Sequence, residues 1–213
     1  MKPVVAIDGP AGSGKGTLAR MIASHFNFVY LDTGLLYRTV AFLNVPLVKI
    51  RAMGIKELLD TAFTLTNEQL RSAENSARAS NIAKMPEIRD IMNRLQRDFI
   101  ELYKKQGTVL DGRDIGTVVV PDACCKLFIT ADLEERAKRR FADLKDQNTT
   151  FDEIFNSMKL RDTQDKSRKI APLTCDKTYI VVDTTGQSVQ ESFKICREEV
   201  KKAFMNSEFR SFV

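Results

Sequence analysis

The sequence predicts an α/β protein in which helices cover both faces of a five-stranded parallel sheet. Five short apolar runs, several of them rich in β-branched residues, alternate with helical patterns along the chain. With 213 residues, of which 43% are hydrophobic, the chain is long enough to bury a core of its own. The predicted strands are residues 4–7, 28–31, 108–111, 126–130 and 179–183.

The first strand leads directly into a glycine-rich loop. The residues of this loop are Gly9, Pro10, Ala11, Gly12, Ser13, Gly14, Lys15, Gly16 and Thr17. Glycines let backbone N–H groups converge on phosphate oxygens, and the N-terminus of the following helix adds partial positive charge. Lys15 can then reach the β- and γ-phosphates of a nucleotide. We therefore predict a P-loop.

The loop departs from the common P-loop pattern after its lysine. Gly16 follows Lys15, and the hydroxyl group comes one residue later, at Thr17. The sequence therefore leaves open which oxygen helps to hold Mg²⁺, directly or through water.

Polar residues also follow the second strand. Asp32, Thr33 and Gly34 end the run at 28–31, and a helical pattern starts at Leu35. Parallel strands end at one edge of a sheet, so this segment is expected beside the P-loop. Arg38, just beyond it, is a candidate for an anion contact.

The middle of the chain contains the weakest pattern. We interpret residues 44–78 as an insertion, because Pro46, Gly54 and scattered charges interrupt any regular period. A strong pattern resumes at Pro86, where apolar residues at i, i+3, i+4 and i+7 predict an amphipathic helix with proline in its first turn. Arg89 lies beside its apolar stripe.

The third strand ends in a group of charged residues, Asp111-Gly112-Arg113-Asp114. An acid at the end of this strand stands where a P-loop protein carries its Walker-B aspartate. Asp111 is therefore a candidate for Mg²⁺ together with Thr17, partly through water. The alternative is a charged turn after a strand.

The last third of the chain predicts a helix from Leu133, a polar break near residues 146–150 and a further helix over 151–160. Arg161, Asp165 and Arg168 follow at i, i+4 and i+7, which places them on one side of a helix. They are either a solvated face or contacts to a shared anion.

Composition excludes several classes of protein. The four cysteines form no C-x-x-C pair and His25 is the only histidine, so we expect a reducing cytoplasm and neither a zinc site nor histidine base chemistry. We expect no signal peptide or membrane-spanning segment. The net charge of +5 comes from interleaved charges, which small anionic ligands explain as well as a polynucleotide does.

The arginines indicate the type of acceptor. A kinase that acts on an alcohol needs a base near the hydroxyl group. A nucleoside monophosphate is already ionised, because its second pKa is about 6, so its site needs cations instead. Arginines at strand ends, helix starts and the border of the predicted lid suit the second task; these are Arg38, Arg89, Arg113, Arg161 and Arg168.

On these motifs the sequence resembles the bacterial cytidylate kinases, which are nucleoside monophosphate kinases of the P-loop class. The motifs run in family order and are residues 7–17, 31–34 with Tyr37-Arg38, 111–119, and 161–168 with Ala171-Pro172-Leu173. The resemblance implies transfer of the γ-phosphoryl group of ATP, with Mg²⁺, to CMP or dCMP. It also implies a cytoplasmic monomer that binds neither nucleic acid nor membrane.

The resemblance implies roles for individual residues. Residues 9–17 bind ATP, and Lys15, Arg113 and Arg161 are catalytic. The acceptor is bound by Thr33, Tyr37, Arg38, Ser80, Arg89, Arg113, Asp114, Asp165 and Arg168. Among these, Ser80 and Arg89 match positions that read the cytosine. Asp165 and Arg168 match contacts to the sugar and the acceptor phosphate.

The same resemblance implies one kinase domain. Its core is residues 1–43, 79–144 and 161–213, with the acceptor-binding insertion at about 44–78 and a lid at about 145–160. The bacterial long form has a strand-rich hairpin in the insertion, and residues 44–78 show no convincing alternating strand pair. A reduced acceptor-binding lobe is therefore expected to loosen discrimination among pyrimidines, or between ribose and deoxyribose.

Three other interpretations stay open on the sequence. The acceptor can be UMP, a deoxynucleotide or another phosphorylated metabolite. A nucleotide switch that hydrolyses GTP would need an N-K-x-D motif, which is absent, and its D-x-x-G match at Asp183 comes too late. An ATPase that binds nucleic acid is supported only by the basic pI of about 9.0.

Overall fold

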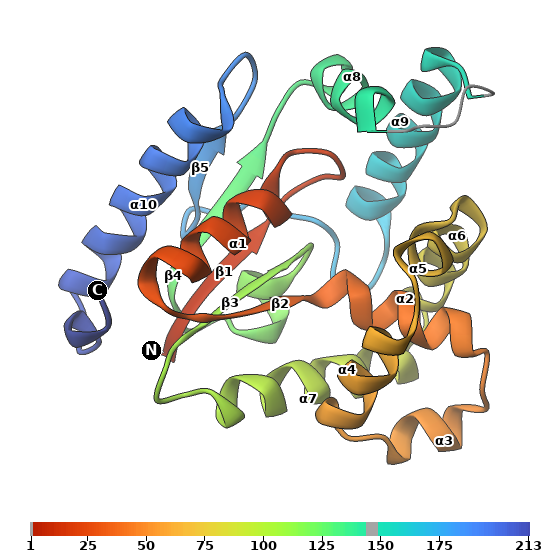
Figure 1. Cartoon of the computed structure of the whole chain (residues 1–213), viewed down its shortest axis with the longest axis horizontal. Coiled ribbons are helices and arrows are strands. Elements are labelled where there is room, and N and C mark those ends of the chain that lie inside the picture. Colours follow the sequence, from red (N-terminus) through yellow and green to blue (C-terminus); the bar gives the residue numbers. More distant parts are fainter. Residues whose placement is uncertain (1, 144–148) are drawn as a thin grey trace. The chain divides into compact units, whose positions relative to one another are not determined.

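The computed structural model describes residues 2–143 and 149–213 (Figure 1). The chain forms two compact units. The core unit comprises residues 1–31 and 105–213, and the helical unit comprises residues 32–104. The predicted insertion at 44–78 falls within the helical unit. The predicted lid falls in the core unit, but residues 145–148 lie outside the described part.

A five-stranded sheet is the centre of the core unit. Its strand order is β2-β3-β1-β4-β5, and β1 pairs in parallel with both β3 and β4, as β4 does with β5. The α/β class and the five strands predicted from the sequence are confirmed. The strands are β1 (Lys2–Asp8), β2 (Val29–Asp32), β3 (Thr108–Gly112), β4 (Ala123–Thr130) and β5 (Ile180–Asp183). Because β1 is the central strand, the loop that follows it starts at the middle of the sheet edge.

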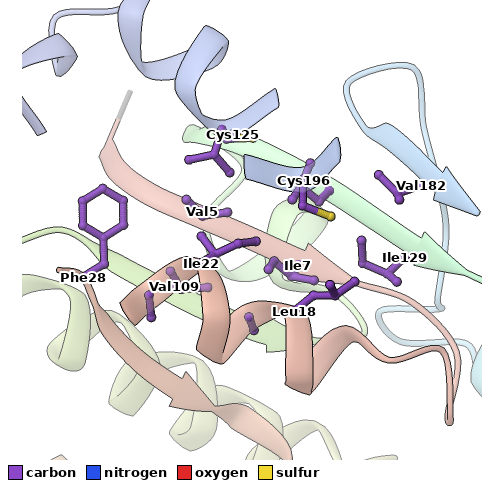
Figure 2. Close-up of a cluster of buried hydrophobic side chains, with 14 of the residues drawn as sticks. Val5, Ile7, Leu18, Ile22, Phe28, Val109, Cys125, Ile129, Val182 and Cys196 are labelled. Atoms are coloured by element: carbon purple, nitrogen blue, oxygen red, sulfur yellow. The ribbon is translucent and has the colours of Figure 1, made fainter. Parts of the chain in front are cut away.

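Helices α1 and α10 supply the apolar side chains that pack on this sheet. Figure 2 shows Leu18 and Ile22 of α1 and Cys196 of α10 in one buried cluster with strand residues such as Ile7. The helical segments of the core unit are α1 (Lys15–Phe26), the π-helical turn η1 (Ile115–Val119), α8 (Leu133–Asp143), α9 (Phe151–Ser167), α10 (Val189–Met205) and the 3-10 turn η2 (Arg210–Phe212).

Side-chain caps fix where α9 and α10 begin. Thr150 and Glu153 form a capping box at α9, and Ser188 and Glu191 form one at α10. The C-terminal turn η2 is packed against the core: the Phe212 ring lies 6.3 Å from that of Phe28 and 6.5 Å from that of Phe204.

The helical unit contains six helices in its described residues and no strand beyond Asp32, so residues 44–78 contain no hairpin. Its helices are α2 (Thr33–Leu43), α3 (Leu47–Ala52), α4 (Ile55–Thr64), α5 (Asn67–Arg71), α6 (Ala73–Ile82) and α7 (Pro86–Leu102). The weak sequence pattern over residues 44–78 is explained by the shortness of the helices there, because α3 to α6 have between 5 and 10 residues each. Hydrogen bonds join three helices of this unit, since the Asn75 amide of α6 donates to the carbonyl oxygens of Arg38 on α2 and Leu70 on α5.

Helix α7 matches its prediction, with Pro86 at its first turn and a buried apolar stripe. In the described part of the chain, no helix is long and apolar enough to cross a membrane.

Candidate active site

The P-loop runs from the end of β1 to the start of α1. Gly9 packs so closely on β4 that a Cβ atom there would collide with the carbonyl oxygen of Ile129. Gly14 adopts φ +84° and is the N-cap of α1, a left-handed conformation that favours glycine. The two glycines therefore hold the loop open toward the N-terminus of the helix, where N–H groups and the helix dipole favour phosphate.

Lys15 is the first residue of α1 and folds back over its own loop. Its Nζ donates a hydrogen bond to the carbonyl oxygen of Pro10 at 3.0 Å. Thr17, which was predicted to help with Mg²⁺, is exposed on the first turn of the same helix. The first turn carries no acidic side chain, so nothing there repels an anion.

Asp111, at the end of β3, lies beside the P-loop. A Cβ atom on Gly16 would stand 3.3 Å from Asp111 Oδ2, and Asp111 Oδ1 accepts a hydrogen bond of 3.0 Å from the Tyr30 hydroxyl. No three His, Cys, Asp or Glu side chains cluster to hold a metal within residues 2–143 and 149–213. Magnesium is commonly held by one or two carboxylates together with nucleotide phosphates. One carboxylate next to the loop fits that mode.

Arg113 and Asp114, which follow β3, form a cluster with Asp165 of α9 and with Arg168 at the end of that helix. Arg113 Nε donates to Asp165 Oδ2 at 2.8 Å, and Arg168 Nη1 lies 3.8 Å from Asp165 Oδ1. Arg168 Nη2 also lies 3.9 Å from Asp114 Oδ1. Two guanidinium groups thus converge on one buried carboxylate. The structure brings together the four residues of this group that the sequence predicted for the acceptor.

The charge of Asp165 is stabilised by these arginines. Burial alone would raise its pKa, but the attraction of Arg113 and its hydrogen bond, aided by Arg161 and Arg168, lower the pKa below the ordinary 3.8. Asp165 therefore stays ionised at neutral pH. Arg161, predicted to be catalytic, lies one turn away on α9 and contributes to this effect through its charge.

Asp8, the last residue of β1, is fully buried. Its carboxylate accepts hydrogen bonds from the Ile115 and Gly116 amides, both at 2.9 Å, and from the Tyr179 hydroxyl at 2.6 Å. Burial raises the pKa of Asp8, while the three hydrogen bonds lower it in part. The pKa of Tyr179 is raised above its ordinary value, first by burial and second by the negative charge of Asp8.

Arg136 on α8 is a functional candidate that sequence reasoning missed. Its side chain is 6% exposed. Its guanidinium group donates to the Ala11 carbonyl oxygen of the P-loop at 3.0 Å and pairs with Asp162 of α9 at 2.7 Å. The sequence shows Arg136 only as one member of a mixed charged run. Its position after the fourth predicted strand, where P-loop proteins approach the nucleotide, was the available signal.

The helical unit contains a second such cluster, on Asp32. Asp32 caps α2 by accepting from the Leu35 amide, and its Oδ2 accepts from Arg38 at 2.8 Å and from Arg71 at 3.0 Å. Gly34 leaves room for the Arg38 side chain, since a Cβ there would stand 2.8 Å from Nη1. Asp32 and Arg71 were not predicted as site residues.

The other predicted acceptor residues of this unit are spread over three helices. Thr33 is buried and Tyr37 half-buried on α2, and Ser80 is half-buried on α6. Arg89 of α7 is 3% exposed and donates to the Ala83 carbonyl oxygen at 3.3 Å.

Comparisons with known proteins agree on one family. A family model described as cytidylate kinase matches residues 5–202. A cytidylate kinase of Cereibacter sphaeroides is 41% identical over 207 residues, which cover 94% of this chain and 96% of the relative. One of Bartonella bacilliformis is 43% identical over 198 residues, covering 89% of this chain and 90% of the relative.

Solved structures with lower identity share the fold. An uncharacterized protein of Eubacterium ventriosum has a TM-score of 0.53 at 15% identity and covers 92% of this chain and 97% of its own. TT1252 of Thermus thermophilus has a TM-score of 0.50 at 18% identity, and the match covers 92% of this chain and 95% of the TT1252 chain.

Proposed function

The chain belongs to the cytidylate kinase family, and from that premise we propose how its residues transfer the γ-phosphoryl group of ATP to CMP. The enzyme is a phosphotransferase that uses ATP and acts on CMP. The observation that supports the residue assignment is the convergence of Arg113 and Arg168 on Asp165, in the unit that also contains the P-loop. This arrangement holds two guanidinium groups close to the end of β3.

The donor is proposed to bind at residues 9–17. Backbone N–H groups at the start of α1 bind phosphate oxygens, and Lys15 exchanges the Pro10 carbonyl oxygen for the β- and γ-phosphates. Arg136 holds the Ala11 carbonyl oxygen and so fixes the shape of the loop before ATP arrives.

Acceptor contacts are proposed for each unit by itself. Those of the core unit are Arg113, Asp114, Asp165 and Arg168. Those of the helical unit are Thr33, Tyr37, Arg38, Ser80 and Arg89. The phosphate of CMP is already a nucleophile at neutral pH, so no base is required. Arg113 and Arg161 offset the repulsion between donor and acceptor phosphates and the charge that develops as the phosphoryl group moves. We include residues 145–160 as the lid that excludes water from this reaction.

Mg²⁺ is proposed to be held by Asp111 and by the phosphates of ATP, with Thr17 acting directly or through water. When bound, the ion would neutralise negative charge on the phosphates of ATP. The protein contributes the position of Asp111 beside Gly16 and the Tyr30 hydroxyl that orients its carboxylate.

The acceptor range is the second part of the proposal. The helical unit lacks a strand hairpin in its described residues, so we propose that CMP and dCMP are both accepted and that UMP or another monophosphate is used more slowly. We also propose that the protein is a monomer and that it is cytoplasmic. The free thiols of Cys124, Cys125, Cys175 and Cys196 support the reducing compartment.

The test is ADP release from Mg-ATP with CMP, dCMP, UMP, AMP or no acceptor at equal concentrations. We expect release to depend on CMP or dCMP and to be abolished in Lys15→Met, which controls for contaminating kinases. Similar rates with all monophosphates would remove the base preference. Release that needs no acceptor would contradict the proposed site.

A further inference from the structure

The segment that carries Arg113 and Asp114 is fixed at both ends by one buried residue. On one side, β1 and β3 pair in register with Asp8 opposite Gly112. On the other side, the Asp8 carboxylate accepts hydrogen bonds from the amides of Ile115 and Gly116, each at 2.9 Å. Only Arg113 and Asp114 lie between these two attachments. Asp8 therefore sets the direction in which both side chains leave the sheet.

Tyr179 completes this arrangement from a distant part of the chain. Its hydroxyl donates to Asp8 Oδ2 at 2.6 Å. A Cβ atom on Gly116 would stand 2.7 Å from the same hydroxyl oxygen, so the three residues are in close contact. The hydroxyl group holds the carboxylate in the orientation that receives both amides.

Asp8 also adjoins the donor site. It directly precedes Gly9, the glycine that packs on the Ile129 carbonyl oxygen. The end of β1 is thus fixed on β4 by Gly9 and joined to the Arg113 segment by the Asp8 side chain. One residue connects the start of the P-loop with the arginine assigned to the acceptor.

We propose that Asp8 and Tyr179 are positioning residues for phosphoryl transfer, which align Arg113 and Asp114 with the P-loop without contacting either nucleotide. The proposal rests on the role assigned to Arg113 above. A misplacement of about 1 Å in a positioning group can reduce turnover about 100-fold. Loss of the hydroxyl alone should act less strongly, because both amide bonds to Asp8 remain.

The first test is Tyr179→Phe, which removes one hydroxyl group and keeps the ring. We expect kcat/KM for CMP to fall about tenfold while KM for ATP stays within about twofold. Thr108→Val is the matched control, because it removes a buried hydroxyl group at the opposite end of β3 that makes no hydrogen bond in the structure. It should leave both constants unchanged.

The second test combines Tyr179→Phe with Arg113→Ala. If Tyr179 acts through Arg113, adding Tyr179→Phe to Arg113→Ala should change turnover less than about twofold. A full further loss in the double variant, or a rise in KM for ATP as large as the loss in kcat/KM for CMP in the single variant, would show a general structural role and overturn the proposal. Asp8→Asn, if it folds, should lower kcat/KM for CMP more than Tyr179→Phe does.

The two proposals fail in different ways. Unchanged turnover in Arg113→Ala would remove the acceptor assignment and with it the purpose of Asp8. A large loss in Arg113→Ala combined with no effect of Tyr179→Phe or Asp8→Asn would leave the acceptor assignment intact and overturn only the positioning role.

Discussion

The two units hold their arginines by the same device, one aspartate between two guanidinium groups, but at different depths. In the core unit, Asp165 binds Arg113 and Arg168, and all three side chains are at most 16% exposed. In the helical unit, Asp32 binds Arg38 and Arg71, and Arg71 is 49% exposed. Burial shields both ion pairs of the first cluster from solvent, whereas solvent screens the Arg71 pair of the second.

From this difference we expect the cluster on Asp165 to control chemistry and the cluster on Asp32 to control acceptor binding. A buried carboxylate can keep guanidinium groups aimed in one direction before any ligand arrives, which favours transition-state contacts. A half-exposed arginine such as Arg71 can exchange its carboxylate for an incoming phosphate at low cost. Four substitutions sharpen or break this comparison.

The largest expected effect is that of Arg113→Ala. We expect kcat with CMP to fall about 1000-fold with ATP binding nearly unchanged, because a charge contact to the transferring phosphoryl group is lost. Steady-state rates and nucleotide titration measure the two quantities. Arg71→Ala, from the other cluster, should change kcat little. Similar losses in both variants would break the comparison.

Arg136→Met tests a third pair of the core unit. It leaves the buried Asp162 carboxylate without its cation, so we expect unfolding free energy to fall by about 4 kcal/mol. KM for ATP should also rise, since the Ala11 carbonyl oxygen loses its donor. Urea unfolding and initial rates measure these effects. Lys138→Met, on the exposed face of the same helix, is the control and should unfold at an unchanged midpoint.

Asp165→Asn should lower the unfolding free energy by about 3 kcal/mol at pH 7, because two arginines lose a buried anion. The pKa of Asp165 is lowered in the folded state, so its charge stabilises the protein above the ordinary value of 3.8. That contribution is lost as the pH falls through the lower folded value. The gap between wild type and variant should therefore shrink below about pH 4, and urea unfolding across pH 3–7 would reveal a constant gap if the assignment is wrong.

Asp32→Asn should have the smallest effect. Asparagine keeps an oxygen for the Leu35 amide, so the helix cap survives and only partly exposed ion pairs are lost. We expect the unfolding free energy to fall by at most about 1 kcal/mol. KM for CMP should change severalfold, while kcat stays nearly constant. A fall in kcat as large as that of Asp165→Asn would place both clusters in the same role.

The P-loop and the five strands could be predicted because their signals are local. The spacing of Gly9, Gly14 and Lys15 alone predicts the P-loop, and each strand is a continuous apolar run. The motif 111–119 was also evident, but its π-helical turn was not, because η1 is held by Asp8, more than 100 residues away. The short helices over residues 44–82 depend on contacts such as those of Asn75, which no period in the sequence indicates.

Arg136, Asp32 and Arg71 were missed for the same reason. Each gains its importance from a partner brought near by folding, as Asp162 is brought to Arg136. Charge patterns along the sequence do not separate such residues from solvated neighbours like Lys138. Arg113, Asp165 and Arg168 could be proposed from the sequence because they lie within motifs, and the structure places the three side chains together.

The position of β1 at the centre of the sheet has a consequence for synthesis of the chain. β1 is made first, yet its partners β3 and β4 end only at residues 112 and 130. The helical unit is continuous in sequence and lies between β1 and its partners. On the ribosome, the apolar run Val4–Ile7 therefore has no strand partner until this unit has been synthesised. Mostly local contacts form early and the non-local sheet forms late. Nascent chains stopped before residue 123 therefore lack a partner for one flank of β1 and expose that strand to chaperones.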